Sequence, residues 1–206
     1  ATQYIPISLA VLIFYTGPFF IIIISRFTEK EPVTIPRLTA ICTAFFGLVL
    51  ALKVGNPNSL PTIGILLAFA AAIGMALFVT VSGLAIRTAS PQAVNLHSLA
   101  GGTFLFGLFL IVMGRPSGSI TCNGLLLLIA SGFSLAVGFI TFFGGLKRIG
   151  PVRASLLMNA EPIFTIIIAS ILLGERLLPS QLAGAGLVVI GIVLITCLPK
   201  AVQREG

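Results

Sequence analysis

A single acidic side chain lies inside the long apolar runs of this 206-residue chain, and it is the residue best suited to chemistry there. Glu161 stands well within one such run and is followed by Pro162. An ionised carboxylate at the centre of a membrane helix costs on the order of 3 kcal/mol, so we expect Glu161 to face the interior of a helix bundle. Two interpretations stay open: Glu161 carries a proton, or it hydrogen-bonds a neighbouring helix as a neutral acid.

Two prolines mark places where a membrane helix would be interrupted. Pro18 and Pro162 have no N–H, so each leaves the carbonyl four residues earlier without its helical partner. Tyr15 and Asn159 lie three residues before these prolines, on roughly the same helix face. A kink that aids packing is the alternative to a binding role. We predict a substrate cavity lined by Tyr15, Thr16, Pro18, Asn159, Glu161 and Pro162.

Other polar side chains have simpler interpretations. His97 stands at one end of an apolar run among other polar residues, which is typical of an interfacial or capping cluster. Gly184 and Gly191 are seven residues apart and share a helix face, which favours close helix packing. Hydroxyl groups inside the runs can bond their own helix backbone, and this applies to Thr80, Ser82 and Thr141.

The composition argues against catalysis, metal binding and nucleic-acid binding. The chain has one His and no Asp, and Cys42, Cys122 and Cys197 match no zinc or redox spacing. We therefore expect no catalytic residue, no metal site and no cofactor. The net charge of +7 is spread singly between apolar runs, without the dense basic stripe that phosphates require. The charge rings or carbonyl-lined loop of an ion channel are not evident either.

The elements that position these residues are membrane helices. The chain is 57% hydrophobic and only 8% charged, with a mean hydropathy of +1.17. Soluble domains carry roughly 25% charged residues, so this chain cannot cover a water-facing surface. We predict an all-α membrane protein in which seven apolar runs each cross the bilayer as a helix: residues 5–25, 38–54, 60–86, 94–114, 124–146, 154–174 and 182–198.

The basic residues predict the orientation in the membrane. The chain has 12 Lys and Arg residues, and nine of them fall on one side of the predicted spans: Arg26, Lys30, Arg37, Arg87, Lys147, Arg148, Arg153, Lys200 and Arg204. The positive-inside rule makes that side cytoplasmic. We expect an integral protein of the bacterial inner (plasma) membrane, with its C-terminus in the cytoplasm.

The chain also matches itself after a shift of 144 positions. Pro18 falls on Pro162, Glu31 on Glu175 and Gly47 on Gly191. The first two predicted spans therefore repeat as the last two. They are five crossings apart, so the copies run in opposite directions, which is the inverted repeat of many secondary transporters. Chance similarity between apolar stretches is the alternative.

These stretches resemble the EamA family of the drug/metabolite transporter superfamily. The resemblance is carried by GPVRASLLMNAEPIFT at 150–165, LLGER at 172–176, QLAGAG at 181–186 and GIVL at 191–194. It implies ten helices in two inverted five-helix repeats around a central cavity. Residues 1–56 would then be the last two helices of a first repeat, and residues 57–206 a complete second repeat. We expect three further helices to precede the chain.

The sequence therefore favours a transporter of small metabolites or drug-like solutes that works by alternating access. A non-functional or structural fragment of such a transporter is the alternative, and an intramembrane enzyme is a weaker one. The expected partners are the lipid bilayer, a small-molecule solute, and upstream helices or a second copy that completes the bundle. No nucleic-acid partner is expected.

Overall fold

The computed structural model describes residues 3–28, 33–52, 61–114, 121–173 and 178–197. Every regular element in these ranges is an α-helix. Six helical stretches are long and apolar enough to cross a membrane, and a shorter apolar helix covers Ile35–Ala51. The prediction of an all-α membrane protein is confirmed. The chain forms two compact units, one of Ala1–Val81 with Pro151–Gly206 and one of Ser82–Gly150.

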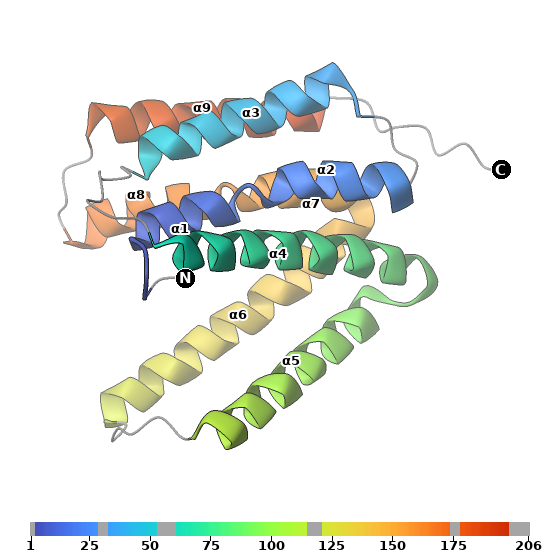
Figure 1. The fold of residues 1–206 in the computed structure, drawn as a ribbon, viewed down its shortest axis with the longest axis vertical. Coiled ribbons are helices and arrows are strands. Elements are labelled where there is room, and N and C mark those ends of the chain that lie inside the picture. Colours follow the sequence, from blue (N-terminus) through green and yellow to red (C-terminus); the bar gives the residue numbers. More distant parts are fainter. Residues whose placement is uncertain (1–2, 29–32, 53–60, 115–120, 174–177, 198–206) are drawn as a thin grey trace. The chain divides into compact units, whose positions relative to one another are not determined.

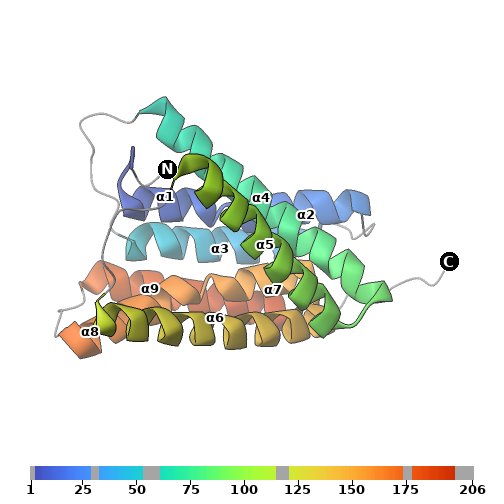
Figure 2. The same ribbon diagram turned by 90° about the horizontal axis from the view of Figure 1, so that it is seen from below.

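The first unit holds two copies of a three-helix pattern. One copy comprises α1 (Ile7–Phe14), α2 (Gly17–Thr28) and α3 (Ile35–Ala51), and the other α7 (Pro151–Met158), α8 (Glu161–Leu173) and α9 (Pro179–Cys197). Every helix in the second copy begins 144 residues after its counterpart in the first. The two copies run in opposite directions, as the path from α1 to α2 and from α7 to α8 shows (Figure 1, Figure 2).

The first and sixth predicted spans are each divided into two helices. Residues 15–16 and 159–160 are turns, and the Thr16 and Ala160 amides donate to carbonyls three residues earlier instead of four. Both breaks come just before the prolines because Pro is tolerated in the first turn of a helix, where no N–H donor is needed. The sequence predicted an interruption; the structure places it two to three residues before each proline.

Helix starts also differ from the predicted spans by a few residues. The helices α3, α5 (Pro91–Met113) and α9 begin three residues before the apolar runs, because Pro36, Pro91 and Pro179 occupy their first turns. The matched glutamates Glu31 and Glu175 lie outside the described residues. So do the predicted span ends at positions 54, 174 and 198.

Small residues hold α3 and α9 together as an antiparallel pair (Figure 1). A Cβ placed on Gly184 would lie 2.5 Å from the Gly47 carbonyl oxygen, and one placed on Gly191 would lie 2.7 Å from the Ala40 carbonyl oxygen. The repeat relates Gly47 to Gly191 and Ala40 to Gly184, because each pair of positions is 144 residues apart. The two close contacts between α3 and α9 are therefore equivalent positions of the repeat. Close backbone approach of this kind is how membrane helices gain packing energy. The predicted packing role of Gly184 and Gly191 is confirmed.

Gly184→Ala is therefore expected to destabilise the chain by about 1–3 kcal/mol, since the new methyl group meets backbone atoms of Gly47 and Ala51 that cannot rotate away. Gly186→Ala is the matched control on the same helix, because nothing lies within 4 Å of its Cβ. It should be neutral or slightly stabilising through helix propensity. Thermal unfolding in detergent measures both. Equal melting temperatures for the two variants would contradict the close seam.

The helix α4 (Thr62–Thr88) begins in the first unit, beside α1. A Cβ on Gly64 would lie 2.7 Å from a methyl carbon of Ile5, and Ala68 belongs to a small apolar cluster with Ile5 and Ala10. Met75 follows two turns later on this helix and lines the cavity described below. The start of α4 thus packs against α1 and the residues before it, and α1 is the helix that ends at the first break.

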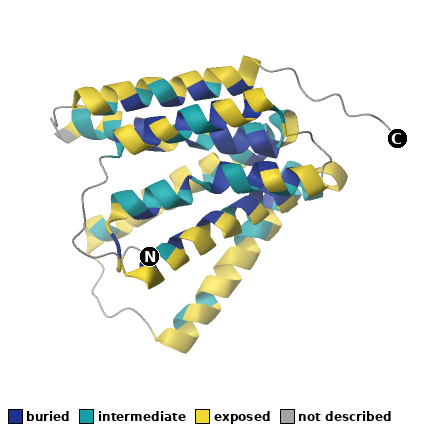
Figure 3. Cartoon of the chain, turned by 45° about the horizontal axis from the view of Figure 1, so that its top comes forward, coloured by how far each residue is buried: buried dark blue, intermediate teal, exposed yellow. Residues whose placement is uncertain are grey.

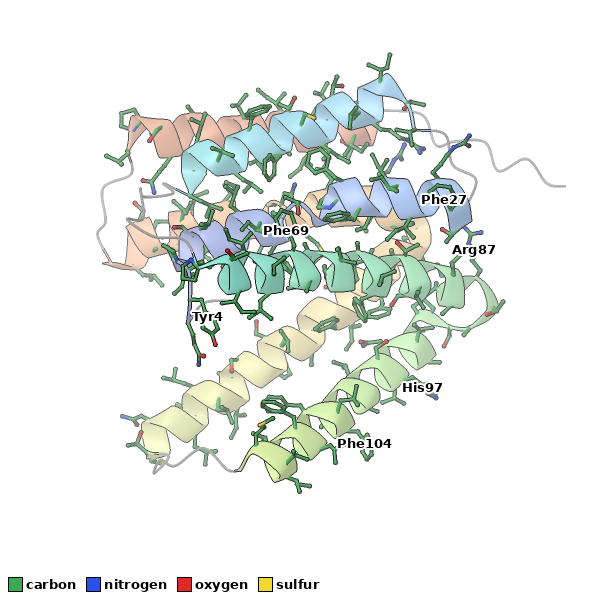
Figure 4. All side chains as sticks on the ribbon, viewed as in Figure 1. Tyr4, Phe27, Phe69, Arg87, His97 and Phe104 are labelled. Atoms are coloured by element: carbon green, nitrogen blue, oxygen red, sulfur yellow. The ribbon has the colours of Figure 1, made fainter. Side chains whose placement is uncertain are left out.

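The second unit contains the end of α4, α5 (Pro91–Met113) and α6 (Cys122–Ile149). Ser90 and Thr121 cap α5 and α6, because their hydroxyl oxygens accept from the amides of Ala93 and Gly124 at 3.2 Å. Most residues of these two helices are exposed, and exposed residues are yellow in Figure 3. Apolar side chains make up most of this exposed surface, and Phe104 is an example (Figure 4). Such surfaces suit hydrocarbon and not water.

Candidate solute site at two helix breaks

The two helix breaks meet through one hydrogen bond. The Tyr15 hydroxyl, at the end of α1, donates to Oε2 of Glu161, the first residue of α8, at 3.2 Å. The residues are 146 positions apart, so this bond joins one copy of the repeat to the other. The structure thus places Glu161 within hydrogen-bonding distance of a polar group on a neighbouring helix.

Packing fixes the Tyr15 ring. Its side chain is 8% exposed and belongs to an apolar cluster with Leu48 of α3, Ile163 of α8 and Val188 of α9. Phe14 meets the ring edge-to-face, with 5.7 Å between the ring centroids. A ring held on several sides aims its hydroxyl in one direction, so the hydrogen bond to Glu161 requires little further ordering.

Glu161 has an exposed side chain at the start of a helix. It is the first residue of α8 and lies in the N-terminal turn of that helix. The sequence predicted a buried acid, whereas this residue is exposed on the described unit. The difference follows from the break, because a residue that starts a new helix can project away from the turn that precedes it.

Asn159 lies in the second break and is almost completely buried, at 1% exposure. Both amide atoms, Oδ1 and Nδ2, lack a hydrogen-bond partner among the described residues. A buried polar group that forms no hydrogen bond costs about 1–3 kcal/mol. Asn159 is the counterpart of Tyr15 in the repeat, so one copy presents a bonded hydroxyl and the other an unbonded amide.

A small cavity of about 20 Å³ adjoins the two breaks, which is room for roughly one water molecule. Of the six predicted site residues, the structure brings three to this cavity: Tyr15, Pro18 and Asn159. The other lining residues are Phe14, Gly17, Ile21, Met75, Ser155 and Met158.

The remaining predicted site residues have other contacts. Thr16 donates its hydroxyl to the Ile13 carbonyl at 2.7 Å and so helps to end α1. Pro162 is buried in the first turn of α8. Glu161 does not line the cavity but is hydrogen-bonded to Tyr15, which does. Ser155 precedes Asn159 by one helical turn, a spacing that sequence reasoning can detect. No sequence signal indicated Met75, which comes from a helix outside the repeated segments.

Local hydrogen bonds account for the other polar residues singled out in the sequence. In the second unit, Nδ1 of His97 lies 2.8 Å from the Ala93 carbonyl of its own helix, and the side chain projects outward from α5 (Figure 4). Thr80 and Thr141 donate to backbone carbonyls one turn earlier. Within the described ranges, no group of three His, Cys, Asp or Glu residues is placed to hold a metal ion.

Comparison with known proteins finds transporters among the proteins similar to this chain. The profile of the EamA-like transporter family matches residues 62–197. An uncharacterized transporter of Clostridium kluyveri is 30% identical over 201 residues, which cover 94% of this chain and 65% of that protein. An uncharacterized transporter of Archaeoglobus fulgidus is 27% identical over 198 residues, covering 93% and 68%.

The fold itself has a crystallographic counterpart. A protein solved by crystallography superposes with a TM-score of 0.83 at 20% sequence identity, covering 96% of this chain and 71% of the other. That likeness concerns the fold alone. The chain spans about two thirds of the length of the curated relatives it matches.

Proposed function

We propose that this chain, which belongs to the EamA-like transporter family, moves small metabolites or drug-like solutes across the membrane by alternating access. The observation that carries the proposal is the meeting of two helix breaks from oppositely directed copies of one three-helix pattern. Discontinuous helices at the interface of inverted repeats are where secondary transporters place their solute and coupling-ion sites.

The breaks supply the moving parts in this proposal. Residues 15–16 and 159–160 join short helices through turns, so each helix half can tilt with a change at only a few dihedral angles. Rocking of one copy against the other would open the cavity to one side of the membrane and then to the other. The division into residues 1–56 and residues 57–206 as parts of two repeats belongs to the same proposal.

Glu161 is the proposed proton carrier. In the state described by the structure, the Tyr15 hydroxyl donates a hydrogen bond to the Glu161 carboxylate at the N-terminus of α8. Separation of the two breaks would break this hydrogen bond and change the surroundings of the carboxylate. Proton binding would thereby be linked to the position of the helices, which is what coupling to a pH gradient requires.

Solute uptake into liposomes tests the proposed function. The purified chain is reconstituted, and a panel of small metabolites and lipophilic drugs is offered with a pH gradient of either sign. We expect at least one compound to enter faster than it enters protein-free liposomes. Equal rates for every compound, from a preparation that melts cooperatively, would argue against transport by this chain.

The positive-inside rule places the C-terminus in the cytoplasm, and a C-terminal reporter tests this orientation. A fluorescent protein fused after Gly206, which folds only in the cytoplasm, should be bright in bacterial cells. Alkaline phosphatase fused at the same point, which is active only after export, should be inactive. The reverse pattern would contradict the assignment of the nine basic residues to the cytoplasmic side.

A further inference from the structure

We infer that Asn159 recognises the uncharged polar head of an amphipathic solute, an inference that rests on the proposed transport function. The feature that leads to it is a buried amide with two unused hydrogen-bonding atoms at the edge of a cavity. Pro162, three residues later, follows the turn that places Asn159 there.

The amide specifies a partner that both donates and accepts. Oδ1 of Asn159 is an acceptor and Nδ2 is a donor, and neither has a partner in the described part of the chain. Asn159 also lies within a candidate membrane span, Pro151–Leu172, where lipid tails offer no hydrogen bonds. A primary amide, or a hydroxyl group that donates to Oδ1 and accepts from Nδ2, would satisfy both atoms together.

The walls of the cavity specify the rest of the solute. Most of the lining side chains are apolar, and no charged residue of the described ranges lines the cavity. The Ser155 hydroxyl is already used, since it donates to the Val152 carbonyl at 2.9 Å. An ionic head would lose its hydration here without gaining a counter-ion from the lining, because the Glu161 carboxylate is bonded to Tyr15 and does not line the cavity. Met75 and Met158 are adaptable side chains, well suited to apolar bodies of varied shape.

The cavity is too small for a solute in the state described here. A volume of about 20 Å³ holds a water molecule and no larger solute, so a solute fits only when the breaks move apart. The hydrogen bond from Tyr15 to Glu161 joins the breaks and must open for that movement. The unpaired amide disfavours the state described here, whereas the Tyr15 hydrogen bond favours it.

A cysteine at the cavity reports both opening and occupancy. Ser155→Cys is introduced into a chain whose native Cys42, Cys122 and Cys197 are replaced by Ala, and its reaction with a small maleimide is timed in detergent. Three probes of similar size are compared: benzamide, which is neutral, benzylammonium and benzoate. We expect benzamide to slow labelling roughly tenfold at saturation, and the two ions to have no effect.

Removal of the amide tests its role directly. Asn159→Leu keeps the side-chain size and lacks both polar atoms. The concentration of benzamide needed to protect Ser155→Cys from labelling should therefore rise by roughly tenfold or more. Asn95→Leu is the control, because Asn95 is the other buried asparagine with an unpartnered carbonyl oxygen in the described ranges and lies in the second unit. It should leave protection unchanged.

Several outcomes would overturn the inference. These are equal protection by benzylammonium or benzoate, full protection by benzamide in Asn159→Leu, and absence of Ser155→Cys labelling under every condition. The ranking of the three probes decides the question even if Asn159→Leu does not fold. Labelling and protection do not require transport, so an intact protection pattern with no solute uptake would remove the transporter function and leave this site.

Discussion

Glu161→Gln is expected to abolish accumulation of solute driven by a pH gradient, while the chain remains folded. Gln retains the size of Glu and can still accept the hydrogen bond from Tyr15, but it cannot bind and release a proton. The variant should equilibrate solute across the membrane and not concentrate it, so the inside-to-outside ratio should fall to about one. The ratio is measured with labelled solute in liposomes under an imposed pH gradient.

The control for this substitution is Glu161→Asp, which can titrate but has a shorter side chain. It should retain part of the accumulation, although at a lower rate because the carboxylate no longer reaches the Tyr15 hydroxyl well. Unchanged pH-driven accumulation in Glu161→Gln would refute the role of Glu161 as proton carrier. Loss of folded protein in that variant would instead favour the interpretation of Glu161 as a structural residue.

Tyr15→Phe should lower the initial rate of solute uptake by up to roughly tenfold, because it removes the hydrogen bond that joins the two breaks and so disfavours the state with the breaks together, through which alternating access must pass. A hydrogen bond contributes about 0.5–1.5 kcal/mol, and each 1.4 kcal/mol corresponds to a factor of ten. The ring itself, which packs against Leu48 and Val188, is retained. The rate is measured in liposomes that contain equal amounts of each variant.

Tyr4→Phe provides the matched control, since Tyr4 is the only other tyrosine and lies before α1, away from the breaks (Figure 4). Its side chain is 48% exposed. Uptake by this variant should equal that of the parent chain. A Tyr15→Phe rate within twofold of the parent would show that the bond between the breaks has no part in transport.

Much of the fold could be predicted because membrane helices obey strong rules. The apolar runs identified the membrane-spanning segments, and the shift of 144 positions identified the pattern that the helix starts reproduce. The EamA resemblance is confirmed by the family match over residues 62–197. The division of α1 from α2, and of α7 from α8, could not be placed from Pro18 and Pro162 alone, because proline is compatible with both a kink and a helix start.

The site was predicted less completely than the fold. Pairing of Tyr15 with Glu161 depends on how two distant segments pack, and the small residues of the seam between α3 and α9 position those segments. Sequence spacing indicated Tyr15 and Asn159 because they occupy equivalent repeat positions. The spacing gave no indication that the Tyr15 hydroxyl would form a hydrogen bond while the Asn159 amide would have no partner among the described residues. Roles in transport for all six predicted site residues stay predictions.

Counterflow of solute tests the central claim, alternating access at the paired breaks, most directly. Liposomes containing the chain are loaded with unlabelled solute at high concentration and diluted into a trace of labelled solute, without a pH gradient. A carrier must return with solute bound, so labelled solute should accumulate transiently above its outside concentration and then decline. Labelled solute that only rises to the outside concentration, at a rate independent of the unlabelled load, would contradict alternating access.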